Sequence, residues 1–143
     1  TPDDLEARAH MMSAAAMGAT AFQKGLGAIH AMSHPVGAVF NTHHGTTNAV
    51  CMPAVLAFNA DTIRDRFGPA AAYLGIDGGF DGFCEFVQQF NDSFAIPRTL
   101  TEMGVSADRL DDLVAMALDD PSCGGNPVEL TADGIRGLFR ACF

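Results

Sequence analysis

Apolar residues recur three and four positions apart along much of this chain, and that spacing constrains the fold more than any other feature. The clearest run consists of Phe83, Phe86, Val87, Phe90 and Phe94. Such a period places side chains on one face of an α-helix. No segment shows the sustained two-residue alternation, rich in β-branched residues, that is typical of a strand. The sequence therefore predicts an all-α fold.

Start and stop signals divide this pattern into six or seven helices. The expected helices cover residues 3–22, 26–34, 46–57, 61–67, 80–93 and 106–118, with a last one starting at Thr131 and turning Ile135, Leu138 and Phe139 inward. Pro35 is expected to stop the second helix, and Pro53 to bend or divide the third. Gly68 and Pro69 are expected to end the fourth. The aromatic run from Phe80 to Phe94 is expected to lie mostly in the core, and partial exposure would favour self-association.

Composition limits the classes of partner. The chain has 143 residues, 48% of them apolar, which is enough for one core, so residues 1–143 are expected to form a single domain. A net charge of −9 would repel nucleic acids and anionic membrane surfaces. No apolar stretch approaches the roughly 20 residues that a membrane span needs. We therefore expect neither a nucleic-acid nor a membrane partner.

The cysteines indicate a reducing compartment. Cys51, Cys84, Cys123 and Cys142 are far apart and form no CxxC pair. A chain with a core of this size does not need disulfides for stability. We expect reduced, buried thiols and a cytoplasmic protein.

The strongest chemical signal is a cluster of histidines. Four of the five histidines fall within fifteen residues, at His30, His34, His43 and His44. His30 and His34 are one helical turn apart and point from the same face, and His44 follows a loop short enough to fold back toward them. Imidazole nitrogens bind iron, zinc, copper and nickel. The spacing is consistent with a metal or catalytic site, but also with histidines that only form hydrogen bonds within the fold.

The residues around His30 and His34 favour a metal or catalytic site over a purely structural role. The small residues in this stretch are Gly25, Gly27, Ala28, Ala31, Ser33 and Gly37. Small side chains allow a ligand or cofactor to approach the backbone closely, which a purely structural helix does not require.

The order of these residues resembles a known family. The stretch GLGAIHAMSHPVG at 25–37, followed by NTHHG at 41–45, Asn48 and Pro53, closely resembles the histidine signature of the group III, iron-containing alcohol dehydrogenases. Residues 4–8 and 126–143 extend the resemblance over almost the whole chain. It implies the C-terminal helical domain of the dehydroquinate synthase-like fold. The N-terminal nucleotide-binding α/β domain of that fold is absent from this chain.

The resemblance assigns a role to individual histidines. The two metal ligands of the family signature correspond to His30 and His44. His34 corresponds to a histidine near the nicotinamide, with a proton-relay or positioning role. Phe40 is similar in place to residues that line the nicotinamide pocket. His43 stands where the family most often has proline and is expected not to be a ligand; His10 has no counterpart and is expected on a solvated helix face.

The implied activity is that of an NAD(P)-dependent, metal-dependent alcohol dehydrogenase, which interconverts a primary alcohol and its aldehyde. Fe²⁺ or Zn²⁺ would polarise the alcohol oxygen, hydride would move to NAD or NADP, and His34 would pass the released proton toward solvent. A small alcohol or aldehyde is the expected substrate, in a homo-oligomer. The family completes its metal site with an upstream aspartate and a histidine four residues later, and neither is present here. The chain alone is therefore expected to be inactive.

Two alternatives stay open at this point. Maleylacetate reductases share the scaffold, but they tend to place a second histidine directly after the first and to replace the glycine after the last. Ala31 and Gly45 at these positions favour the alcohol dehydrogenase branch. The other alternative is a non-catalytic helical module that binds a metal.

Overall fold

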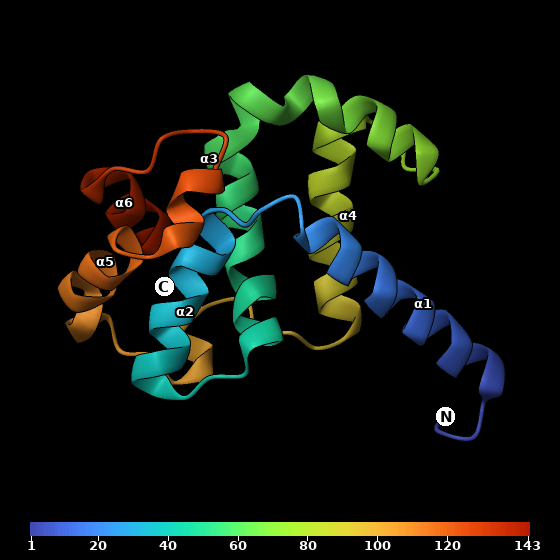
Figure 1. The fold of residues 1–143 in the computed structure, drawn as a ribbon, viewed down its shortest axis with the longest axis horizontal. Coiled ribbons are helices and arrows are strands. Elements are labelled where there is room, and N and C mark those ends of the chain that lie inside the picture. The colour runs from blue at the N-terminus through green and yellow to red at the C-terminus, as the bar shows by residue number, and fades with distance from the viewer.

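The architecture is a set of packed helices without any strand (Figure 1). A computed structural model describes all residues, 1–143. Its six α-helices are α1 (Leu5–Phe22), α2 (Ala28–Phe40), α3 (His44–Tyr73), α4 (Gly79–Ser93), α5 (Leu110–Leu118) and α6 (Ala132–Cys142). Three short 3₁₀ helices, η1 (Thr101–Met103), η2 (Ala107–Arg109) and η3 (Pro121–Gly125), connect them. The predicted all-α class is confirmed.

The main core lies between α2, α3, α5 and α6. Met32, Leu113, Ile135 and Phe139 have no measurable exposure there. Burying a side chain of this size stabilises the folded state by about 1.5–3 kcal/mol. Thr131 caps α6 by accepting a hydrogen bond from the Gly134 N–H, and the predicted inward face of that helix is confirmed.

A smaller cluster joins α4 to α3. Phe80 and Val87 are buried there, together with Leu56 and Ile63 of α3. The prediction that the aromatic run lies mostly in the core is wrong for its outer side chains, although the partial exposure that the sequence allowed is observed. Phe86, Phe90 and Phe94 are 41%, 52% and 65% exposed, because α4 packs mainly against α3 and these side chains lie on the face turned away from it.

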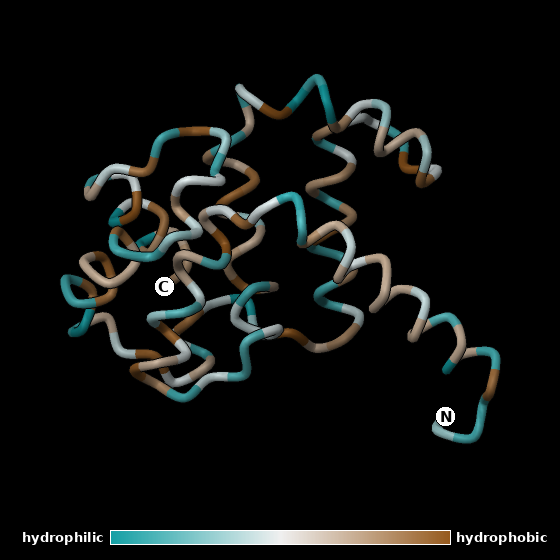
Figure 2. Tube along the Cα trace, in the orientation of Figure 1, coloured by the Kyte–Doolittle hydropathy of each residue, from teal (hydrophilic) through white to brown (hydrophobic).

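Helix α1 projects from the rest of the molecule (Figure 1). Asp4 caps it by accepting a hydrogen bond from the Ala7 N–H, close to the predicted start. None of its residues is buried, although apolar colouring continues along it in Figure 2. The exposed large side chains on it are Leu5, Met11, Met12, Met17 and Phe22.

Helix α2 continues beyond the predicted stop. Pro35 lies inside the helix, which ends only at Phe40, where Asn41 adopts a left-handed φ of 54°. The prediction that the helix stops before Pro35 is wrong because Pro35 and Val36 are both buried. Their packing offsets the cost of about 3 kcal/mol that proline imposes inside a helix.

Helix α3 replaces two predicted helices. It runs without interruption from His44 to Tyr73 with Pro53 and Pro69 inside it, and Figure 1 shows that its last part bends away from the first. The predicted break between 57 and 61 and the predicted stop at Gly68 are wrong. Buried side chains lie on both sides of the expected break, at Val55 and Ile63, and Ala71 is buried beyond the expected stop. Neither α3 nor any other helix combines the length and apolarity that crossing a membrane requires.

Candidate functional site

Three of the four clustered histidines meet where α2 and α3 lie side by side. His30 and His34 project from α2, and His44 is the first residue of α3. Their ring centroids form a nearly equilateral triangle: 5.7 Å between His30 and His34, 5.2 Å between His30 and His44, and 5.4 Å between His34 and His44. The left-handed turn at Asn41 reverses the chain and makes this meeting possible.

Asn48 marks the point that two of these rings face. Its Nδ2 lies 3.3 Å from Nε2 of His30 and 3.1 Å from Nε2 of His44. The amide donates, so both Nε2 atoms present lone pairs toward one place. The Oδ1 atom of Asn48 is buried and has no hydrogen-bond partner. Asn48 was part of the resemblance to the family signature but had no predicted role in the site; its position four residues after His44, on the same helix face, was the available signal.

Asp120 contacts the third ring. Its Oδ2 lies 2.7 Å from Nδ1 of His34, and its Oδ1 accepts a hydrogen bond of 2.8 Å from the Ser122 N–H. Burial is the largest single influence on this carboxyl and opposes its ionisation. The hydrogen bonds from Ser122 and His34 together outweigh burial, and the pKa of Asp120 lies below its usual value. Asp120 was missed in the sequence because it is 86 positions from His34.

The surroundings of His30 disfavour the charged form of its imidazole. Partial burial lowers its pKa, and positive charge on His44 or His34 lowers it further, while Asp120 acts in the opposite direction. A neutral imidazole is the form that binds a metal ion, so this environment favours ligation.

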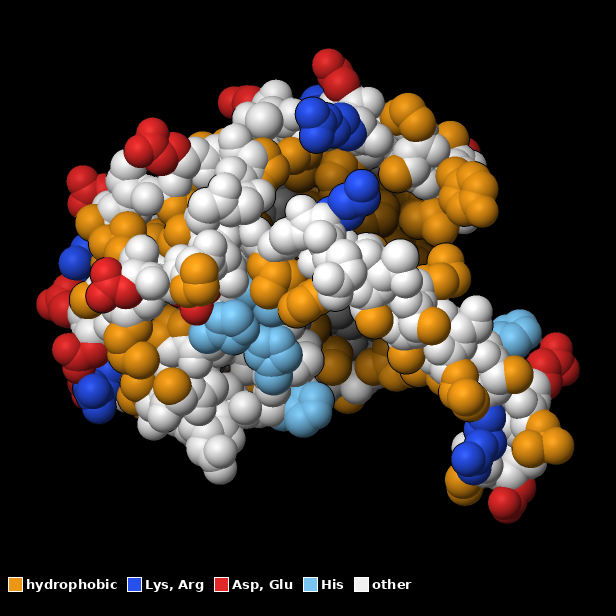
Figure 3. Space-filling view, in the orientation of Figure 1, with side chains coloured by type: hydrophobic (Ala, Val, Ile, Leu, Met, Phe, Trp, Pro, Cys, Tyr) orange, Lys and Arg blue, Asp and Glu red, His pale blue; other side chains and the backbone are white.

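The other predicted residues lie outside the triangle. His43 is exposed and caps α3, with Nδ1 accepting a hydrogen bond from the Thr46 N–H at 3.3 Å. Phe40 is half-buried against the main core, six residues and about 9 Å along α2 from His34. His10 is exposed on α1. Figure 3 shows several pale-blue imidazoles grouped near the C-terminal end of α1, where that helix joins the rest of the molecule.

The donor set fits part of a metal site. No group of three or more His, Cys, Asp or Glu side chains is placed to hold a metal ion. His30 and His44 nevertheless direct two Nε2 lone pairs to the position of the Asn48 amide. Imidazole nitrogens suit both Fe²⁺ and Zn²⁺, so these two residues fit either ion as half of a four-ligand set.

A groove of about 450 Å³ adjoins His30. It runs between the end of α1, the start of α2 and the middle of α3, and its apolar lining includes Phe22, Ile29, Leu56 and Phe67. The side of the histidine triangle that faces α1 therefore borders an apolar groove.

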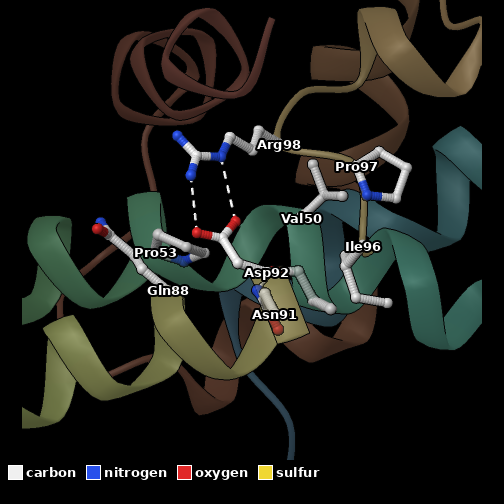
Figure 4. A pocket seen from close by; sticks show the side chains of 9 residues that line it. Val50, Pro53, Gln88, Asn91, Asp92, Ile96, Pro97 and Arg98 are labelled. Atoms are coloured by element: carbon white, nitrogen blue, oxygen red, sulfur yellow. Dashed lines mark hydrogen bonds and ion pairs between the residues drawn. The ribbon is translucent and has the colours of Figure 1, made fainter. Parts of the chain in front are cut away.

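A separate hollow of about 210 Å³ lies between α3 and the end of α4 (Figure 4). Arg98 donates two hydrogen bonds there to Asp92, of 3.1 and 2.7 Å, so its charge is already neutralised. No histidine lines this hollow, and we assign no chemistry to it.

Comparison with known proteins covers the whole chain. The model of the Fe-containing alcohol dehydrogenase family, C-terminal, matches residues 1–143. The 4-hydroxybutyrate dehydrogenase of Cupriavidus necator is 42% identical over 96% of the chain, and the chain spans 38% of that relative's length.

Two solved structures share the arrangement of helices. A 1,3-propanediol oxidoreductase aligns over 82% of the chain and 33% of its own length, with 28% identity and a TM-score of 0.77. The maleylacetate reductase of Rhizobium sp. strain MTP-10005 aligns over 83% of the chain and 32% of its own length, with 26% identity and a TM-score of 0.65. Both therefore contain the same helical domain as part of a longer chain. The chain belongs to the Fe-containing alcohol dehydrogenase family and corresponds to its C-terminal, all-helical domain.

Proposed function

We propose that this chain is the metal-site domain of an NAD(P)-dependent alcohol dehydrogenase that interconverts a small primary alcohol and its aldehyde. The observation that carries the proposal is the convergence of the His30 and His44 Nε2 atoms on one point, with His34 beside them. Membership of the family supports the reaction class.

His30 and His44 are the metal ligands in this proposal. A bound Fe²⁺ or Zn²⁺ would supply a Lewis acid that lowers the pKa of an alcohol hydroxyl. Two imidazoles leave such an ion open to further ligands, which the remainder of the protein must provide. The chain alone is therefore expected to be inactive.

His34 takes the proton that the alcohol loses. Its side chain is 42% exposed, so one part of the ring reaches solvent while another lies against His30 and His44. A group that contacts both the site and water can move a proton between them. Phe40 is proposed to contact the nicotinamide of NAD or NADP from the end of α2.

Net charge and exposed apolar residues bear on the partners and the oligomeric state of the enzyme. A net charge of −9 favours small-molecule substrates over nucleic acids or anionic membranes. We place the enzyme in the cytoplasm. The exposed Phe86, Phe90 and Phe94 support a homo-oligomer, because an apolar run of this length is typical of a covered surface.

Maleylacetate reduction is the less favoured activity. Ala31 follows the first ligand and Gly45 follows the last, whereas a maleylacetate reductase tends to differ at both positions. A non-catalytic metal-binding module is disfavoured by the family match along the whole chain.

A chimera tests the proposal. Residues 1–143 replace the matching segment of the Cupriavidus necator relative, whose own upstream region supplies the rest of the enzyme. We expect alcohol-dependent reduction of NAD(P). His34→Ala should lower kcat by about 10²–10⁴-fold and alter the pH–rate profile, whereas His10→Ala should change neither. A folded chimera without dehydrogenase activity would refute the proposed reaction, and an unchanged pH–rate profile in His34→Ala would refute the relay.

A further inference from the structure

We propose that Asp120 is a positioning residue for His34, holding the imidazole in the tautomer with its proton on Nδ1 so that Nε2 is the basic atom. This inference rests on the proposed function for its catalytic meaning, but it concerns a contact that can be measured in the chain alone.

The Asp120 carboxylate is held in one orientation. Its side chain is only 12% exposed, and both oxygens are engaged: Oδ2 with His34 Nδ1 at 2.7 Å and Oδ1 with the Ser122 N–H at 2.8 Å. The second bond is also the N-cap of η3. Turning the carboxylate away from His34 would therefore uncap η3.

Hydrogen-bond chemistry then fixes the proton on the ring. An ionised carboxylate only accepts hydrogen bonds, so the atom facing it, Nδ1, must donate. The proton of a neutral His34 is therefore on Nδ1, and the lone pair is on Nε2. A carboxylate at Nδ1 also fixes the orientation of the ring, so that Nε2 is the nitrogen able to accept a proton.

The three histidines of the triangle differ in their hydrogen-bond partners. His30 and His44 share the neutral amide of Asn48 at Nε2, whereas His34 has a carboxylate at Nδ1. A proton relay needs one ring nitrogen free to accept, and the contact of Asp120 with Nδ1 leaves Nε2 of His34 in that state. Asp120 thus distinguishes the proton-transfer histidine from its two neighbours.

The substitution Asp120→Asn tests this assignment because it preserves the cap. Asparagine is as good an N-cap as aspartate, so its single oxygen is expected to keep the Ser122 bond. Its amide group would then face His34 and donate to Nδ1, which moves the ring proton to Nε2. Asp119→Asn is the matched control, since it removes the same charge from the adjacent, exposed residue.

The measurement is a long-range ¹H–¹⁵N spectrum of the ¹⁵N-labelled chain, at a pH above the range in which imidazoles titrate. We expect a protonated Nδ1 for His34 in the parent chain and in Asp119→Asn, and a protonated Nε2 in Asp120→Asn. Circular dichroism of each variant verifies that the helices are retained. A parent chain with the proton on Nε2, or the same tautomer in Asp120→Asn as in the parent, would overturn the proposal.

The same variant separates this inference from the proposed function. In the chimera, Asp120→Asn should lower kcat by about 10²-fold or more while metal content stays constant. An inverted tautomer with unchanged kcat would confirm the positioning by Asp120 and refute the relay role of His34.

Discussion

Asn59 and Asn126 exchange two side-chain hydrogen bonds, 3.0 and 2.9 Å long, across 67 positions of the sequence. Asn126 also donates to the Val128 carbonyl at 2.7 Å and accepts from the Ala28 N–H at 3.2 Å. One amide therefore joins the middle of α3 to the first residue of α2. Through that connection the segment after η3 holds in place the helix that carries His30 and His34.

Asn126→Ala should destabilise the chain. It removes the partners of the Asn59 amide, which is 5% exposed, and of the Ala28 N–H. A buried polar group without a partner costs about 1–3 kcal/mol, so the free energy of unfolding should fall by about 2–3 kcal/mol in urea titrations. Gln89→Ala, at an exposed position of α4, is the control and should change it by less than about 0.5 kcal/mol. Equal midpoints for Asn126→Ala and the parent would contradict this account of the amide.

Gly125→Ala should also destabilise the chain, for a steric reason. A Cβ at Gly125 would overlap the carbonyl oxygen of Leu26, which belongs to the backbone and cannot rotate away. The expected loss is about 1–3 kcal/mol. The adjacent Gly124 has open space around it, so Gly124→Ala is a matched control that should leave thermal unfolding nearly unchanged. Similar Tm values for the two variants would contradict the close approach of Gly125 to the Leu26 carbonyl.

Acidification should weaken the fold through His30. Burial first, and then the charges of His44 and His34, lower the pKa of His30 below the ordinary 6.5. The unfolded chain therefore binds a proton at a pH where the folded chain does not, and the free energy of unfolding falls as the pH drops below 6.5 toward the lowered pKa.

Urea titrations between about pH 5 and 8 measure this dependence. His30→Gln should reduce the slope, and His10→Gln, on the exposed surface of α1, should not. If both variants reduced the pH dependence of the free energy of unfolding equally, the effect would not be specific to His30.

The four thiols should differ in reactivity. Cys51 and Cys142 are buried, and a hydrogen bond between them is the largest cause of the raised pKa of Cys51, followed by burial. Cys84 and Cys123 are only half-buried. Because the thiolate is the reactive form, Ellman's reagent should modify two thiols in the native chain and all four after unfolding. Cys84→Ala and Cys123→Ala should each remove one fast-reacting thiol; four equally fast thiols would contradict the described packing.

Local periodicity was sufficient to predict the all-α class and the His30–His34 pair. Helix faces depend on neighbours three and four positions away, and that information is local. The prolines predicted helix ends at Pro35 and Pro69 that the structure does not have. At Pro35, which is buried, tertiary packing outweighed the local cost of proline within a helix. Pro69 is itself exposed, and the helix continues past it to the buried Ala71.

The partners of the histidines were not predictable in the same way. Asp120 reaches His34 from 86 positions away, and Asn126 reaches Asn59 from 67. No local pattern brings such pairs together; the packing of α5 and η3 against α2 does. The exposure of Phe86, Phe90 and Phe94 has a similar cause, because periodicity reveals an apolar face but not whether a neighbour covers it.

Metal content tests the central claim most directly. Elemental analysis of the dialysed chimera should find about one Fe²⁺ or Zn²⁺ ion per chain in the parent and in His10→Ala, and a loss of most of it in both His30→Ala and His44→Ala. Undiminished metal in both of these variants would contradict the assignment of His30 and His44 as ligands.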